Sequence, residues 1–286
     1  MFKREWSSAE KLLAIIVCLC FGFLLSSLVV GTLYGYMQEG ASYKFLLILS
    51  SVISFGLPAF FIAKFVESGR GAFSYIGMTH SPDITKYALV VVFMFAIMPA
   101  IELISSLNAL YSFPDSLSGL EEYFRNADAR ASQATQTALV ADSFPMYILN
   151  LLAIAITPAS CEEMFFRGIL QNYFAGVVKN KHLTVLLTAL IFSVVHLQFS
   201  GLLPRFILGA VIGYIYILTG SLWPSIVAHA TNNMLVVSVA YFADVDVSQV
   251  PDLGSYANPW WIATLVSGLV VAVFTVWLFR KQDADE

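Results

Sequence analysis

A long apolar run that ends in charged residues organises this chain: residues 144–167 read FPMYILNLLAIAITPASCEEMFFR. An ionised side chain at mid-depth in a bilayer costs about 2.5–3.5 kcal/mol, so three such charges are expected together only where they are paired or used. In a helix, Glu163 and Arg167 lie four residues apart on one face and can pair, whereas Glu162 points about 100° away from Glu163. Glu162 therefore needs a partner from another part of the chain.

The composition is that of a polytopic membrane protein. Of the 286 residues, 58% are hydrophobic and 12% are charged, and the apolar residues form blocks of bilayer-spanning length. The net charge is −4 and the chain has no basic run, so nucleic acid is not an expected partner. The cysteines Cys18, Cys20 and Cys161 lie in apolar runs without disulfide or metal-site spacing, and we expect them to pack.

The apolar blocks predict an all-α fold of about eight transmembrane helices around a polar intramembrane cavity. They form one transmembrane domain over residues 1–286, and the first block is predicted to be a retained helix, because it is too long for a signal peptide. Pro158 should kink the fourth span just before Glu162 and free a backbone carbonyl, which makes this region a candidate cavity wall. The predicted spans are 12–37, 45–66, 86–110, 144–174, 183–199, 204–219, 222–242 and 260–280.

The distribution of basic residues predicts the orientation of the chain. Eleven lysines and arginines fall on the side of the two termini, against four on the opposite side. By the positive-inside bias, both termini are placed in the cytoplasm. We therefore expect a multi-pass protein of a cell membrane, the bacterial inner membrane, with membrane lipid as a partner.

Strong polar residues recur inside the later spans. His196 lies in the fifth predicted span, and His229, Asn232 and Asn233 lie in the seventh. His229 and Asn233 are one helical turn apart and share a face, whereas Asn232 is displaced around the helix. The carboxylate of Glu162, two imidazoles and an amide can therefore converge from three helices into one pocket.

This set of groups can perform hydrolysis. A poorly hydrated carboxylate can take a proton from water, an imidazole can share that proton or pass it to the leaving amine, and an amide N–H can stabilise the developing oxyanion. The same groups can instead bind a metal, because two histidines and one glutamate are the ligands of many catalytic zinc sites. No His-Glu-x-x-His motif is present, so such ligands would come from separate helices.

Packing roles compete with each of these assignments. A single membrane histidine or asparagine most often joins helices by hydrogen bonds, and the Glu163–Arg167 pair favours a structural role because it neutralises itself. Glu102, next to no histidine or asparagine in the sequence, is a minor candidate. The joint occurrence of Glu, His, His and Asn favours a functional site, since separate packing roles would not require all four.

Three motifs resemble those of a known family. Glu162-Glu163-x-x-x-Arg167, Phe192-x-x-x-His196 and His229-x-x-x-Asn233 occur in this order on successive predicted helices. They are similar to the motifs of the CPBP family, which comprises the CAAX proteases and bacteriocin-processing enzymes. Each motif alone is weak, but the ordered set over a motif-bearing core, residues 144–240, is specific.

The resemblance implies an intramembrane endopeptidase like the type II CAAX prenyl endopeptidases. It implies that Glu162 and His196 activate water and that His229 and Asn233 stabilise the oxyanion, while Glu163 and Arg167 are supporting residues. A metal-free glutamate mechanism is favoured. Zinc is the alternative cofactor, and its ligands would be Glu162, His196 and His229.

The expected substrate is a membrane-associated peptide or a membrane protein. Bacteria generally lack prenylated CAAX proteins, so a literal CAAX substrate is not favoured. The alternative function is non-catalytic: a membrane immunity, scaffold or transport protein that uses the same polar cluster for binding. Neither inverted repeats nor paired interrupted helices, which are typical of transporters, are evident in the sequence.

Overall fold

The computed structural model describes residues 6–66, 71–111, 113–243 and 264–270. All the regular structure in these ranges is helical, as the sequence predicts. Residues 264–270 are also helical, and they are the described part of the predicted span 260–280. The α-helices are α1 (Ser8–Tyr34), α2 (Gly40–Ser51), α3 (Leu57–Phe61), α4 (Ala72–Tyr75), α5 (Ile84–Ala109), α6 (Ser118–Leu139), α7 (Phe144–Asn150), α8 (Thr157–Phe165), α9 (Asn172–Val178), α10 (Lys181–Val194), α11 (Leu202–Thr219) and α12 (Leu222–Ala243).

Short π-helical and 3-10 segments join several of these helices. The π-helical segments are η1 (Val52–Gly56), η2 (Ile62–Val66), η4 (Leu151–Ile156) and η5 (Phe166–Gln171), and η3 (Asp115–Leu117) is a 3-10 turn. As a result, residues 40–66 and 144–178 each form one continuous helical rod of membrane-spanning length.

Six helical segments in the described residues are long and apolar enough to cross a membrane, namely 8–34, 40–66, 84–109, 144–178, 202–219 and 222–243. The protein is therefore an all-α, polytopic membrane protein. The fifth predicted span is a shorter apolar helix, α10, and most of the eighth lies outside the described residues. The predicted count of eight is not established by these residues.

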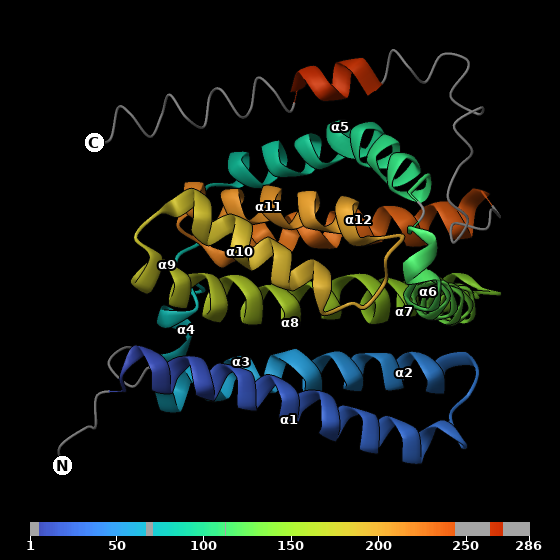
Figure 1. The fold of residues 1–286 in the computed structure, drawn as a ribbon, viewed down its shortest axis with the longest axis horizontal. Coiled ribbons are helices and arrows are strands. Elements are labelled where there is room, and N and C mark those ends of the chain that lie inside the picture. Colours follow the sequence, from blue (N-terminus) through green and yellow to red (C-terminus); the bar gives the residue numbers. More distant parts are fainter. Residues whose placement is uncertain (1–5, 67–70, 112, 244–263, 271–286) are drawn as a thin grey trace.

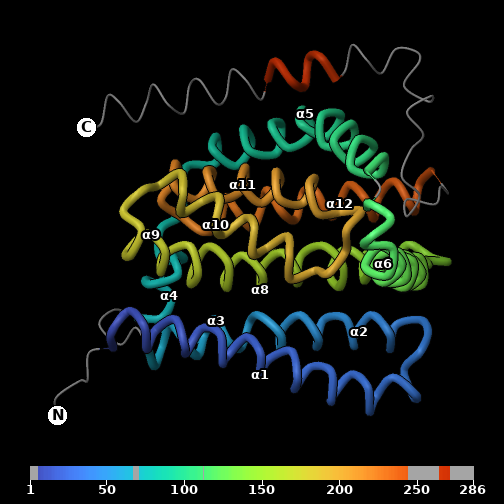
Figure 2. The backbone as a smooth tube through the Cα atoms, viewed as in Figure 1, coloured from blue at the N-terminus to red at the C-terminus, as the bar shows by residue number. Residues whose placement is uncertain are grey.

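The helices pack in layers around α8 (Figures 1 and 2). One layer contains α1 with the rod formed by α2 and α3, and the opposite side contains α10, α11 and α12, with α5 beyond them and the helical residues 264–270 beyond α5. Helix α8 contacts η1 on one side and α12 on the other. The rod that carries Glu162 and Glu163 is thus placed at the centre of the protein.

Aromatic packing fixes the position of this central rod. Phe165 and Phe166 are fully buried, and Phe55 from η1 lies against both rings, with centroids 6.0 and 5.6 Å away. Phe166 also makes an edge contact with Phe192 of α10 at 5.0 Å. Burial of large aromatic surfaces on both sides of the rod holds the neighbouring acidic residues in a defined orientation.

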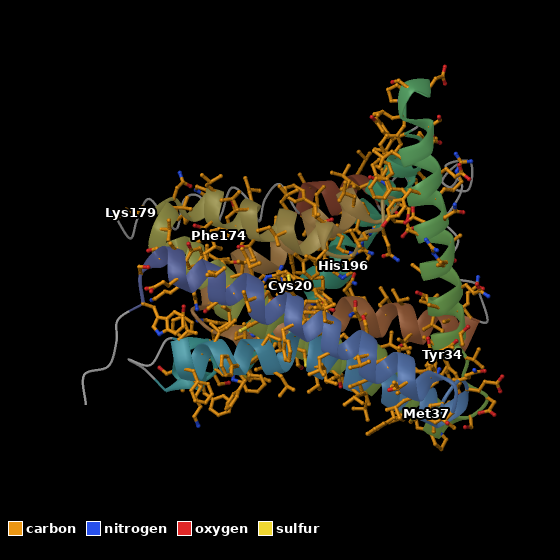
Figure 3. All side chains as sticks on the ribbon, turned by 60° about the horizontal axis from the view of Figure 1, so that its bottom comes forward. Cys20, Tyr34, Met37, Phe174, Lys179 and His196 are labelled. Carbon is orange, nitrogen blue, oxygen red and sulfur yellow. The ribbon has the colours of Figure 1, made fainter. Side chains whose placement is uncertain are left out.

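Helix α6 is amphipathic and crosses one end of the bundle at a steep angle to α1 (Figure 3). The backbone carbonyls of its last turn accept hydrogen bonds from side chains of other helices. Lys44 of α2 donates to the carbonyls of Thr137 and Ala138, and Asn150 donates to the carbonyl of Leu139 at 2.8 Å. These bonds satisfy carbonyls that a helix C-terminus leaves without partners, and they tie α6 to the bundle.

Candidate active site

Glu163 is the centre of a buried ionic network. Its Oε1 accepts from Nη1 of Arg167 at 2.7 Å and lies 2.8 Å from Nδ1 of His229, and both members of the Glu163–Arg167 pair have fully buried side chains. Arg167 Nη2 donates to the carbonyl of Gly209 at 2.7 Å. The partner predicted from four-residue spacing is therefore present, and the network links α8, α11 and α12.

Glu162 faces a different environment from its neighbour. Its Oε2 lies 3.9 Å from Nε2 of His229, and its side chain retains 13% exposure where that of Glu163 has none. His229 thus lies between two carboxylates, with one ring nitrogen hydrogen-bonded to Glu163 and the other directed at Glu162. The partner that Glu162 requires comes from α12, more than sixty residues away in the sequence.

His196 lies in the turn that follows α10, not inside a helix that continues to residue 199. The helix ends at Val194, and Leu197 adopts a left-handed backbone conformation with φ of 54°, which is typical of residues that follow a helix end. The Nδ1 atom of His196 lies 2.7 Å from the carbonyl oxygen of Phe192. Nδ1–H donation to this carbonyl leaves Nε2 as the ring nitrogen available for chemistry.

Phe192 is a packing residue that contacts both histidines. Its ring makes edge contacts with His196 and His229, at centroid distances of 5.1 and 5.7 Å, and the guanidinium of Arg167 lies 5.0 Å from its centroid. The Phe192-x-x-x-His196 motif therefore brings one imidazole toward the other. No direct hydrogen bond joins Glu162 to His196 among the described residues.

Asn233 bonds to the carbonyl that Pro158 leaves free. Pro158 has no N–H, so the carbonyl of Ile154, four residues earlier, lacks its usual helical partner. Asn233 Nδ2 lies 3.5 Å from this carbonyl, and Asn232 donates to Asn233 Oδ1 at 3.0 Å. Both asparagines therefore take part in packing between α12 and the central rod, and Asn233 does so one turn from His229.

Arg205 was not predicted from the sequence, and it lies next to this cluster. Its Nη2 donates to Oε1 of Gln198 at 2.6 Å, and it is within electrostatic reach of Glu162, His196 and Asp128. Arg205 lies at the start of an apolar helix, where an arginine is more often an interfacial anchor. The packing of α11 against α10 and against the central rod brings it to the site, and the sequence carries no local signal of that packing.

Asp128 of α6 approaches the same region. Its Oδ2 accepts from the backbone N–H of Ser200 at 3.0 Å, and Asn108 of α5 donates to the carbonyls of Phe199 and Ser200. The turn that contains His196 is thus held by polar contacts from α5 and α6. These contacts fix an otherwise irregular segment beside the catalytic candidates.

A cavity of about 250 Å³ lies between α2, α6 and the central rod. Its lining includes Ser50, Ala134, Ile154 and Pro158. Pro158 precedes Glu162 by one helical turn and lies on the same face of α8. The cavity therefore lies beside the face of the rod that presents Glu162, and the small side chains of α6 cover part of it.

The donor chemistry of the cluster is compatible with zinc. A histidine that donates one ring nitrogen to a carboxylate, as His229 does to Glu163, is typical of metal-ligating imidazoles. If zinc binds, Glu162, His196 and His229 would hold it, and it would supply Lewis-acid activation of water. Within the described residues, the His, Cys, Asp and Glu side chains form no group of three at metal-binding distances.

Comparison with known proteins supports the motif assignment. One relative, the uncharacterized protein YyaK of Bacillus subtilis (strain 168), is 30% identical over 168 residues, which cover 51% of this chain and 56% of that protein. This chain therefore spans little more than half the length of that curated relative. No solved structure matches the chain. Residues 144–235 match the family of type II CAAX prenyl endopeptidases described as Rce1-like, and this match confirms the resemblance that the three motifs predict.

Proposed function

We propose that this protein is an intramembrane endopeptidase that hydrolyses peptide bonds by activating a water molecule. The observation that carries this proposal is the position of His229 between two carboxylates, 2.8 Å from Glu163 and 3.9 Å from Glu162. Glu163 has a fully buried side chain whose Oε1 is paired with Arg167 and His229, whereas the side chain of Glu162 keeps 13% exposure. This division leaves Glu162 as the group that can exchange a proton with water.

In the proposed reaction, Glu162 accepts a proton from water as the water oxygen attacks the scissile carbonyl carbon. A carbon–oxygen bond forms, and the carbonyl π electrons move to the oxygen to give a tetrahedral oxyanion. When this intermediate collapses, the carbon–nitrogen bond breaks and the proton held by Glu162 passes to the leaving amine. The products are a new carboxyl terminus and a new amino terminus.

The other residues orient and stabilise these groups. His196 shares the water proton with Glu162 through its Nε2, because its Nδ1 is engaged by the carbonyl of Phe192. His229 and Asn233 hydrogen-bond the carbonyl oxygen as it becomes negative. Glu163 and Arg167 hold His229 and the helix in place, since their mutual charges are neutralised inside the protein.

The proposed substrate is a membrane-associated peptide or a membrane protein. The site lies on helical rods that are long and apolar enough to span a bilayer, so a substrate must reach it from the membrane or from the end of the bundle covered by α6. The cavity lined by Ile154 and Pro158 is a suitable place for residues beside the scissile bond, because it adjoins the face of α8 that carries Glu162.

The test is cleavage of a quenched fluorescent peptide library, with prenylated and unprenylated members, by detergent-purified protein. We expect Glu162→Gln, His196→Ala and His229→Ala to abolish cleavage while expression is unchanged. Glu102→Gln is the matched control, because Glu102 is another intramembrane acid, on α5 and outside the cluster, and this variant should cleave like the wild type.

A zinc chelator separates the two mechanisms. Cleavage that is lost in Glu162→Gln but resists the chelator supports the glutamate mechanism, whereas loss in both supports a metal centre. If all the variants cleave like the wild type, the assignment is wrong. If the wild type cleaves nothing and binds a partner as well as Glu162→Gln does, the non-catalytic function is favoured.

A further inference from the structure

We propose that Arg205 is part of the active site, where its guanidinium forms an anion-binding position for the oxyanion of the tetrahedral intermediate. This inference rests on the proposed function and adds a residue to that site. It is carried by the register of α11 against its neighbours, by the contacts of the guanidinium, and by a buried N–H group without a partner.

The register between the central rod and α11 places Arg205 at the level of the two glutamates. Arg167 donates to the carbonyl of Gly209, and Gln171 donates to the carbonyl of Gly213, so both contacts join residues 42 positions apart. These contacts come from successive turns of two helices that run in parallel. One turn before Arg167 on the rod is Glu163, and the same offset of 42 residues brings Arg205 opposite Glu163 and next to Glu162.

The register between α10 and α11 leads to the same place. Gly209 packs closely against Phe192, because a Cβ added at Gly209 would lie 3.2 Å from the Phe192 ring. The two helices are antiparallel and joined by a short connection. His196 comes four residues after Phe192, and Arg205 comes four residues before Gly209, so both lie closer to this connection and opposite each other. Arg205, Glu162 and His196 therefore share one level of the bundle.

The guanidinium of Arg205 has neutral contacts and one unused donor. Nη2 donates to Gln198, and the guanidinium lies so close to Gly201 that a Cβ there would be 2.7 Å from Nη2. Nη1 is buried and has no hydrogen-bond partner among the described residues. A buried cation with an unsatisfied N–H is costly, so its retention beside a catalytic cluster indicates an anion that arrives with the substrate.

The nearby carboxylates do not satisfy this donor. Glu162 and Asp128 are within electrostatic reach of Arg205, but neither forms an ion pair with it, and Asp128 Oδ1 is itself buried without a partner. The negative charges of the two acids stabilise the Arg205 cation when no substrate is bound, but neither acid accepts a hydrogen bond from Nη1. A substrate oxygen can therefore bind there without displacing a protein group.

The developing oxyanion is the anion that this position fits. Asn233, the residue implied as an oxyanion donor, has its oxygen bonded to Asn232 and its Nδ2 directed at Ile154, so its amide is partly used in packing. Arg205 Nη1 supplies a charged donor at the level of Glu162. Such a donor binds the negative oxygen of the intermediate more strongly than the neutral carbonyl of the substrate, which lowers the barrier.

The experiment compares Arg205→Met with Arg130→Met, in which an exposed arginine of α6 receives the same substitution. We expect Arg205→Met to lower kcat by about 10²–10³ with KM little changed, the size found when one oxyanion donor is removed. Arg205→Lys should recover part of the loss. Gly201→Ala should also lower kcat, since its methyl group displaces the guanidinium, whereas Arg130→Met should match the wild type.

A binding measurement keeps this inference separate from the proposed function. The probe is a leucine-flanked peptide phosphinate, a stable tetrahedral anion, and its uncharged amide counterpart, titrated by calorimetry into wild type, Glu162→Gln and both arginine variants. We expect Arg205→Met alone to lose about 10²-fold or more in phosphinate affinity, with amide binding unchanged. Equal phosphinate binding by Arg205→Met and Arg130→Met, or no binding by the wild type, would overturn the inference, even if Glu162→Gln abolishes cleavage.

Discussion

Glu162 and Glu163 are adjacent in the sequence but have opposite surroundings. Glu163 accepts from Arg167 and contacts His229 in a buried network, while the side chain of Glu162 keeps 13% exposure and lies near the other nitrogen of the same imidazole. A helix turns by about 100° per residue, so two neighbouring acids can face different neighbours. This separation gives one glutamate a structural role and leaves the other free for chemistry.

Glu163→Gln should destabilise the protein strongly. The variant leaves the Arg167 cation buried without its counter-ion, which costs about 3–5 kcal/mol for buried pairs. Glu121→Gln is the matched control, because Glu121 and Arg125 form the same i,i+4 pair on α6, with side-chain exposures of 29% and 73%. Denaturant unfolding of the purified proteins should show a loss for Glu163→Gln and little change for Glu121→Gln. Equal losses would contradict a special role for the buried network.

Residue spacing predicts local partners well and distant ones poorly. Four-residue spacing is sufficient to predict the Glu163–Arg167 pair, because both residues lie on one helix face. Arg205 could not be predicted in the same way, since its position depends on the register of α11 against two other helices. The motif order indicated that Glu162 and His229 would converge, but not that His229 would contact both glutamates.

At the level of elements, α6 depends on contacts from the rest of the bundle. Lys44 is almost fully buried, with 1% exposure, and donates to the carbonyls of Thr137 and Ala138 at the end of α6. A buried carbonyl that loses its donor costs about 1–3 kcal/mol. The last turn of α6 is therefore held to the bundle by a few polar bonds.

Lys44→Met should loosen the last turns of α6. Hydrogen exchange measured by mass spectrometry should become faster for the amides of residues 130–139, because the capped carbonyls lose their donor and the helix end frays. Lys64→Met is the control, since Lys64 is exposed on the same rod. Unchanged exchange in Lys44→Met would show that α6 is held by other contacts.

Ala134→Phe should change which substrates are cleaved. Ala134 is an exposed residue of α6 at the cavity that adjoins Pro158, so a phenyl group there narrows the cavity without overpacking a core. We expect kcat/KM for peptides with large apolar residues beside the scissile bond to fall about tenfold relative to kcat/KM for peptides with small residues there. This is the size of discrimination that a contact in an apolar pocket gives. Ala129→Phe, also exposed on α6 but away from the cavity, should leave the preference unchanged; the same shift in both variants would contradict the assignment.

The element boundaries show where sequence patterns fail. Apolar periodicity continues past residue 194, which led to a predicted span to residue 199. The helix ends earlier because Leu197 takes a left-handed conformation and Asn108 binds the carbonyls of Phe199 and Ser200. Pro158, in contrast, correctly indicated a freed backbone carbonyl. This carbonyl belongs to Ile154, and Asn233 of α12 contacts it.

For the whole molecule, the orientation in the membrane remains a prediction from charge. If both termini are cytoplasmic, α6 and the turn that contains His196 lie on the opposite side. In a Cys20→Ser background, Asn126→Cys on α6 should then react in intact cells with a membrane-impermeant maleimide. Gly176→Cys on α9, where the added side chain has open space, should react only after permeabilisation. The reverse labelling pattern would invert the topology.

The central claim is that Glu162, His196 and His229 form one hydrolytic unit. The most direct measurement is kcat/KM for Glu162→Gln, for each single histidine-to-alanine variant, and for the triple variant. Residues that act together give non-additive losses, so we expect the triple variant to lose no more than a few-fold beyond Glu162→Gln alone. If the losses instead multiply, the three residues act independently and the proposed site is wrong.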